Sequence, residues 1–167
     1  NLKNKKIIQT INAFKGLKFR QEIIYKSKKL TCINDSKATS FASSINILKS
    51  LQQVFWIVGG LPKLGDKFNL KKKECKNIKA YIFGKNRKFF EKQFKNKLSF
   101  CHFKDLNSVV KKVLNDVKNN SNNLHKTILF SPAGASFDSF KNFEERGYHF
   151  NFLLKKHKLT KTINAFK

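Results

Sequence analysis

The feature that most constrains the fold is a set of short, continuous apolar runs, each followed at once by small or turn-forming residues. The runs are Val54–Val58, Ala80–Phe83 and Thr127–Phe130. Segments this short and this apolar are typical of strands buried on both faces, as the central strands of a parallel sheet are. Stretches with helical periodicity separate them along the chain. We therefore expect an α/β fold, with a mostly parallel sheet and helices on both faces.

Helices are expected where apolar residues recur every three or four positions. The clearest stretch is Asp105–Lys118, whose apolar residues form one stripe: Leu106, Val109, Val110, Val113, Leu114 and Val117. The pattern predicts further helices at 4–14, from 39 onwards, and at 86–96, 137–145 and 147–158. A hairpin is expected across Lys26–Lys29, joining strands at 20–26 and 29–33, and another short strand is expected at 98–102.

Composition and charge limit the choice of partners. The 167 residues are enough for one domain with its own core, and the 18 Phe exclude a disordered tail. The formal net charge is +26, yet Lys supplies nearly all of it, and only Arg20, Arg87 and Arg146 are Arg. Nucleic-acid surfaces recruit Arg for bidentate contacts. Codons rich in A and T explain the excess of Lys, Asn, Ile and Phe better. Nucleic acid is therefore not the expected partner, and a basic nucleic-acid-binding module stays an alternative.

The sequence contains no signal for membrane insertion, secretion or a metal site. No apolar run reaches the roughly 18 residues of a membrane span, and the first residues form no signal peptide. Cys32, Cys75 and Cys101 are odd in number and far apart, so neither a disulfide framework nor a zinc site is indicated. Cys32 and Cys101 lie in strand-like apolar runs, which favours buried thiols in a reducing cytoplasm. Because the chain has no Met, we expect it to be a piece of a longer chain.

Three segments rich in small and polar residues are candidate ligand-binding loops. Asn34–Thr39, Gly59–Lys63 and Ser131–Asp138 each lie where a predicted strand ends. An open α/β sheet binds its ligands at the carboxyl ends of the strands, where free N–H groups and hydroxyls face an anion. We therefore expect the three segments to form one site.

The same residues also have purely structural interpretations. Asp35, Thr39 and Ser136 are typical helix caps. Glu144–Arg146 is typical of a surface ion-pair group, worth less than about 1 kcal/mol. The remaining candidates can be read as solvated lysines or as a core aromatic: Lys37, Lys63 and Phe143.

Taken together and in order, the motifs resemble the C-terminal domain of the Mur ligases that add D-glutamate. The resemblance rests on Asp35–Thr39 (DSKAT), Gly59–Lys63 (GGLPK) and, most specifically, Ser131–Gly147 (SPAGASFDSFKNFEERG), and it extends over residues 12–158. It implies a Rossmann-like sheet. It also implies a domain at 16–159, preceded at 1–15 by the end of another domain or a linker helix and followed by a tail at 160–167.

The resemblance also implies a reaction. These ligases use ATP and Mg²⁺ to phosphorylate the carboxylate of UDP-N-acetylmuramoyl-L-alanine, and the amine of D-glutamate then displaces phosphate. The step belongs to cytoplasmic peptidoglycan biosynthesis, and so to cell-wall growth, cell shape and division. The family's phosphate loop and magnesium ligands lie in a central domain, and no Gly-x-x-x-x-Gly-Lys-Ser/Thr motif occurs here. We therefore expect no catalytic residue and no metal ligand in this chain, no activity of the chain alone, and a monomer.

Residue roles follow from the same resemblance. The residues implied to bind D-glutamate are Lys37, Thr39, Lys63, Ser136, Phe137 through its backbone N–H, and Phe143. Arg20 is implied to lie near the phosphates of the nucleotide and Asp35 near its ribose. The family has Pro-His before this Arg, whereas this chain has Lys18 and Phe19, so the role of that His has no counterpart. The alternatives are another ligase of the same fold, such as folylpolyglutamate synthase, or a degraded gene fragment without a function.

Overall fold

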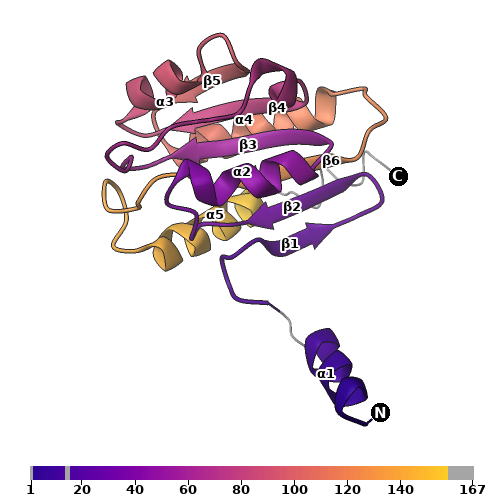
Figure 1. The fold of residues 1–167 in the computed structure, drawn as a ribbon. Helices are drawn as coiled ribbons and strands as arrows, with labels where there is room; N and C mark the ends of the chain where they lie inside the picture. The colour runs from indigo at the N-terminus through magenta and orange to yellow at the C-terminus, as the bar shows by residue number, and fades with distance from the viewer. Residues whose placement is uncertain (1, 14–15, 158–167) are drawn as a thin grey trace.

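A computed structural model of the chain describes residues 2–13 and 16–157. Six strands form one sheet in the order β1-β2-β6-β3-β4-β5 (Figure 1). β1 is antiparallel to β2, and all other neighbouring pairs are parallel. The strands are β1 Glu22–Lys26, β2 Leu30–Asn34, β3 Gln53–Gly59, β4 Ile78–Phe83, β5 Ser99–Phe103 and β6 Lys126–Phe130. The predicted mostly parallel, Rossmann-like α/β sheet and its hairpin are confirmed.

Four helices cover the two faces of this sheet: α2 Phe41–Ser50, α3 Arg87–Phe94, α4 Leu106–Asn119 and α5 Phe143–Lys156 (Figure 1). The described residues also form α1 Leu2–Ala13, which lies apart from the sheet, and the 3₁₀ turn η1 Lys72–Cys75. α4 and α5 pack on one face, and α2 and α3 pack on the other. Phe14, expected in the first helix, and the expected tail at 160–167 lie outside the described residues. None of the helices described is long and apolar enough to cross a membrane.

The two packed faces explain why the central strands are apolar at every position. On β3, Phe55 and Ile57 belong to the core beneath α4 and α5, whereas Val54, Trp56 and Val58 belong to the core beneath α2 and α3. Because side chains alternate along a strand, burial on both faces requires an uninterrupted apolar run. The runs identified in the sequence are therefore β3, β4 and β6.

The last helix differs from the prediction. In place of two helices between 137 and 158, one helix, α5, begins at Phe143. Asn142 caps it, since its side chain accepts a hydrogen bond from the Glu145 N–H at 2.7 Å. Gly147, which the prediction placed at the start of the second helix, lies within α5.

Asp116 on α4 joins this helix to β4. Its Oδ2 accepts hydrogen bonds from Lys79 Nζ at 2.9 Å and from the Tyr81 hydroxyl at 2.7 Å, and its Oδ1 accepts one from Lys112 Nζ at 2.7 Å. Burial opposes ionisation of this carboxyl, but the three donors outweigh it and lower its pKa to about 2. The ionised carboxylate therefore stabilises the folded state.

We predict that Asp116→Asn lowers the free energy of unfolding by about 2 kcal/mol at neutral pH, because the pKa of the folded state lies below that of an unfolded Asp. This stabilisation is present above about pH 4 and is lost as the pH falls towards the folded-state pKa of about 2. Urea unfolding of both forms at neutral pH and near that pKa measures it. A difference between the two forms that does not shrink in acid would contradict the ionic account.

Candidate functional site

The three predicted loops meet at the carboxyl edge of the sheet, because β2, β6 and β3 are neighbours. The Gly59 N–H donates to the Pro132 carbonyl at 2.9 Å, and Leu61 and Ala135 exchange two backbone hydrogen bonds of 2.8 Å. Gly60 permits this approach, since its φ is +111° and a Cβ there would lie 2.5 Å from the Ala135 carbonyl oxygen. The expected convergence of the motifs at one edge is confirmed.

Asp35 joins the first loop to the third. Its Oδ2 accepts a hydrogen bond from the Ser131 hydroxyl at 2.8 Å and its Oδ1 accepts one from the Gln21 N–H at 3.1 Å. Its own N–H donates to the Phe130 carbonyl at 2.7 Å. Burial raises the pKa of the Asp35 carboxyl, against the hydrogen bonds from Ser131 and Gln21 and the charge of Arg20. Asp35 therefore fixes the relative position of two loops.

Arg146, on α5, joins the same first and third loops through its side chain. Its side chain is 0% exposed. Nη2 donates to the Ser36 carbonyl at 2.7 Å, Nε donates to the Ser36 hydroxyl at 3.2 Å, and Nη1 donates to the Gly134 carbonyl at 2.8 Å. A Cβ on Gly60 would lie 3.0 Å from Nη1, so the guanidinium also lies against the second loop. The interpretation of Glu144–Arg146 as a surface ion-pair group is therefore wrong for Arg146, because its guanidinium is buried and bonded to two loops.

The sequence holds a signal that could have placed Arg146 correctly. Arg146, Phe150 and Leu153 recur at helical spacing and are all buried on α5. A charged residue on an apolar stripe is rarely buried without polar partners. The spacing therefore predicts a buried, hydrogen-bonded guanidinium once the helix is known to start at Phe143.

Phe19, which stands where the family has His, is also buried. Its φ is +60°, and its N–H donates to Glu22 Oε2 at 3.0 Å. The ring packs on α5, where a Cβ on Gly147 would lie 2.3 Å from Phe19 Cδ1, and it meets the Tyr148 ring edge-on with 4.8 Å between centroids. Because the Lys37 N–H donates to the Phe19 carbonyl at 3.0 Å, this packing also positions the first loop.

An open pocket of about 460 Å³ brings several predicted binding residues together. Its lining residues are Arg20, Gln21, Asp35, Lys37, Ala38, Thr39 and Ser43. The two residues implied for the nucleotide, Arg20 and Asp35, thus lie beside two implied for D-glutamate, Lys37 and Thr39. The side chains of Arg20 and Thr39 are exposed there. Ser43 was not predicted, although it follows Thr39 by four residues, at the start of α2.

Lys37 lies over the ring of Phe143. Its Nζ is 4.0 Å from the ring centroid, a cation–π contact. The Phe143 carbonyl accepts a hydrogen bond from the Ser36 hydroxyl at 2.8 Å, which ties the start of α5 to the first loop. Lys37 is therefore not a freely solvated lysine, and the half-buried Phe143 orients its ammonium.

The other predicted residues lie on the second and third loops. Ser136 is buried, and among the described residues no hydrogen bond engages its hydroxyl or the Phe137 N–H. The Phe137 ring is 72% exposed. Lys63 is exposed two residues after the Leu61–Ala135 pair and is not part of the pocket lined by Arg20. The third loop thus offers two free donors, while Lys63 remains apart from them.

The interpretation of three of these residues as helix caps is wrong. Ser40 caps α2, since its side chain accepts a hydrogen bond from the Ser43 N–H, and Asn142 caps α5. The residues that cap neither helix are Asp35, Thr39 and Ser136.

The fold and the three loops together define an α/β domain of the class that binds a ligand at the carboxyl edge of a parallel sheet. No protein-family model matches the chain. The chain is 35% identical over 156 residues to the UDP-N-acetylmuramoylalanine--D-glutamate ligase of Rickettsia felis. The aligned residues make up 93% of this chain and 34% of the relative. Ligases of the same name from Prochlorococcus marinus and Petrotoga mobilis are 37% and 39% identical, over 92% and 93% of this chain and 33% and 35% of the relatives.

The chain thus spans about one third of the length of the curated relatives it matches. It is homologous to ligases of that name, as its motifs predict.

We predict that Arg146→Lys lowers the free energy of unfolding by about 2 to 3 kcal/mol, since an ammonium cannot reach both loops and leaves buried carbonyls without a donor. Urea unfolding measures the change. The control is Lys141→Ala, which removes an exposed cation near α5 and should change stability by less than about 0.5 kcal/mol. Equal stability of the two variants would contradict the role given to the guanidinium.

Gly147→Ala is a second test of the packing. Helix propensity alone favours Ala by about 1 kcal/mol, but the new methyl would enter the Phe19 ring, so we predict a net loss of about 1 to 3 kcal/mol. Gly147→Ala should cost less stability when it is added to Phe19→Leu than when it is added to the parent, because the smaller Leu side chain leaves room for the methyl group. If Gly147→Ala is more stable than the parent in thermal unfolding, the described contact is wrong.

Proposed function

We propose that this chain is the C-terminal domain of a ligase that joins D-glutamate to UDP-N-acetylmuramoyl-L-alanine in peptidoglycan biosynthesis, and that it binds the D-glutamate. The observation that supports this most is the convergence of three loops at one sheet edge, in a chain whose relatives have that ligase's name. We further propose a domain at 16–159, the end of a preceding domain or a linker helix at 1–15, a tail at 160–167, a cytoplasmic location and a monomer.

D-Glutamate presents two carboxylates and one amine, and the loops offer matching donors. In this proposal the ammonium of Lys37, oriented by Phe143, and the hydroxyl of Thr39 bind one carboxylate. The hydroxyl of Ser136 and the Phe137 N–H bind the other, and both lack a partner among the described residues. Lys63 reaches a further anionic group of the substrates. The amine has no acidic partner in this set, which leaves it free to react.

The same pocket supports a contribution to the nucleotide site. Arg20 is exposed and can bind phosphate, and Asp35 lies 3.1 Å from a backbone N–H and 2.8 Å from a hydroxyl that hold its carboxylate in place for the ribose. ATP and Mg²⁺ are the proposed cofactors, and they supply the activation of the acid. Within the described ranges no three His, Cys, Asp or Glu side chains could hold a metal ion together. We therefore propose that the magnesium ligands come from the family's central domain.

The role of this chain in the reaction is positioning and exclusion of water. Hydrogen bonds of Asp35, of Arg146 and between Leu61 and Ala135 join its loops. The D-glutamate donors therefore move as one unit when the domain closes over the activated acid. Closure then excludes water from the activated carboxyl group and holds the amine of D-glutamate next to that group.

In a complete ligase that contains this domain, we predict that Lys37→Ala and Ser136→Ala each raise the KM for D-glutamate by about tenfold, because each removes a hydrogen bond to a carboxylate. Steady-state kinetics with varied D-glutamate measure it. Lys118→Ala, which removes an exposed cation at the far end of α4, is the control. Unchanged KM and kcat in both site variants would overturn the assignment.

A further inference from the structure

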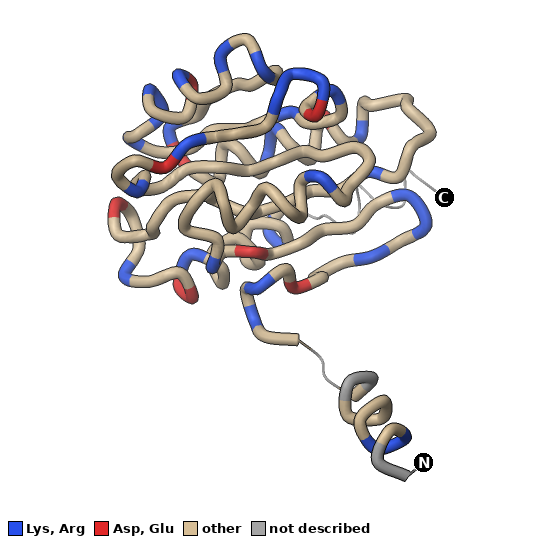
Figure 2. The backbone as a smooth tube through the Cα atoms, viewed as in Figure 1, with Lys and Arg blue, Asp and Glu red and all other residues tan. Residues whose placement is uncertain are grey.

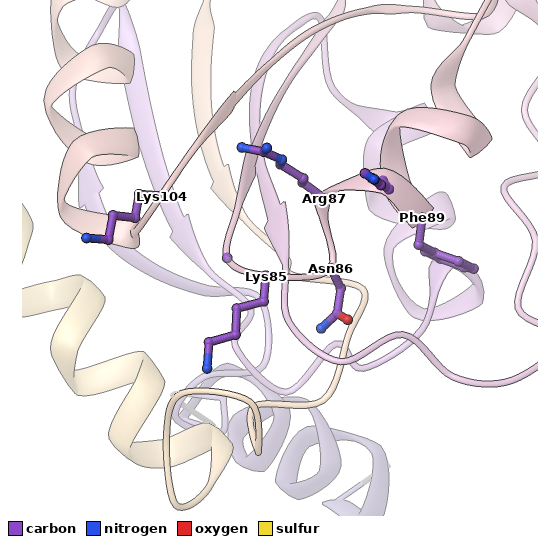
Figure 3. A pocket seen from close by; sticks show the side chains of 7 residues that line it. Lys85, Asn86, Arg87, Phe89 and Lys104 are labelled. Atoms are coloured by element: carbon purple, nitrogen blue, oxygen red, sulfur yellow. The ribbon is translucent and has the colours of Figure 1, made fainter.

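A second open pocket, of about 700 Å³, lies beyond the carboxyl ends of β4 and β5 (Figure 3). It adjoins the proposed D-glutamate site without including any of its residues. The lining residues are Gly84, Lys85, Asn86, Arg87, Lys88, Phe89 and Lys104. They come from the turn before α3, from the first residues of α3 and from the segment between β5 and α4, so two separate parts of the chain form the pocket.

The pocket is strongly cationic. Lys85, Arg87, Lys88 and Lys104 are all exposed, and among the described residues none of them forms an ion pair or a side-chain hydrogen bond. Lysines elsewhere, such as Lys112, do have carboxylate partners. Four like charges around one hollow repel one another, and an anion in the hollow relieves that repulsion.

Two carboxylates lie near these cations, and among the described residues neither forms an ion pair with them. Asp105 follows Lys104 and caps α4, accepting a hydrogen bond from the Ser108 N–H at 2.8 Å. Asp138 lies beneath the turn, where a Cβ on Gly84 would be 3.3 Å from its Oδ2. Its buried carboxylate oxygens have no hydrogen-bond partner among the described residues, and its charge acts on Lys85 as well as on Arg146. With two carboxylates beside four cations, the pocket keeps a net positive charge for a ligand.

Lys and Arg are spread over many loops of this chain, so charge alone does not define a site (Figure 2). This group places four cations around one hollow, and it includes Arg87, one of the three Arg in the chain, whose planar guanidinium suits phosphate. The half-buried Phe89 adds an aromatic surface at the rim, stacked on Phe41 with 6.0 Å between centroids.

We propose that this pocket binds a small polyphosphate group, either inorganic pyrophosphate or the phosphate chain of a nucleotide. Two or three linked phosphates match four cations from two segments, whereas a single carboxylate would leave most of the charge unpaired. The site is linked to the second loop, because Asn86 Nδ2 donates to the Gly60 carbonyl at 3.1 Å. Binding should therefore perturb the Gly60 amide as well as the pocket.

The test is a titration of the 167-residue chain with inorganic pyrophosphate at about 0.15 M salt, where exposed charges further apart than roughly 8 Å are screened. Calorimetry gives the affinity and ¹⁵N NMR locates the site. We expect saturable binding with shifts at Gly84–Phe89 and Lys104. The double variant Lys85→Ala with Lys104→Ala should bind about tenfold more weakly.

The matched control is Lys72→Ala with Lys73→Ala, which removes two exposed lysines of η1 and should change the affinity by less than about twofold. An equal loss in both doubles would show diffuse attraction and overturn the proposal. If Arg20→Ala abolishes binding and the double variant Lys85→Ala with Lys104→Ala keeps it, the anion binds in the pocket lined by Arg20. That result would also overturn the proposal.

ADP distinguishes the two sources of the phosphate group. If ADP binds the pocket more tightly than pyrophosphate, and Phe89→Leu removes the difference, the ligand is a nucleotide. If both bind equally, the pocket recognises the polyphosphate alone. These results do not depend on D-glutamate, so they stand apart from the test of the proposed function.

Discussion

The candidate site depends on the buried guanidinium of Arg146. Three hydrogen bonds from one planar group reach the Ser36 and Gly134 segments, which are far apart in the sequence. Burial lowers the pKa of Arg146 to about 10, against the charge of Asp138. The guanidinium therefore stays protonated at neutral pH. Since its direct partners are carbonyls and a hydroxyl, the loops themselves satisfy the buried charge, and separating them would leave it without partners.

This constraint explains how the three loops keep one arrangement at the sheet edge without a ligand. Asp35 and Arg146 hold the first and third loops together, and the Leu61–Ala135 pair holds the second against the third. On the third loop, the Ser136 hydroxyl and the Phe137 N–H remain without a hydrogen-bond partner among the described residues. Donors that are already in place lose little entropy when a carboxylate binds.

Much of the fold could be predicted because local patterns and burial agree. The uninterrupted run of β3 and the stripe of α4 each describe one buried surface, and the structure places both as expected. The place of Gly147 inside α5 was missed because the contact that fills the space above it comes from Phe19, which is remote in the sequence. Arg146 was misread because charge suggests a surface, and its buried partners belong to other loops.

Only part of the candidate site could be predicted from the sequence, for the same reason. The loops were found from their composition and place after strands, but the pocket beside β4 and β5 arises from cations on two segments with no shared motif. Single residues such as Ser43 likewise have no signal beyond helical spacing. Tertiary contacts of this kind cannot be read from one local window of sequence.

The most direct test of the central claim is an NMR titration of the isotope-labelled chain with D-glutamate and, separately, with L-glutamate. The account predicts saturable shifts at the amides of Lys37, Thr39, Ser136 and Phe137, larger for the D-enantiomer at equal concentration. Equal shifts with both enantiomers, or shifts confined to Gly84–Phe89, would contradict it.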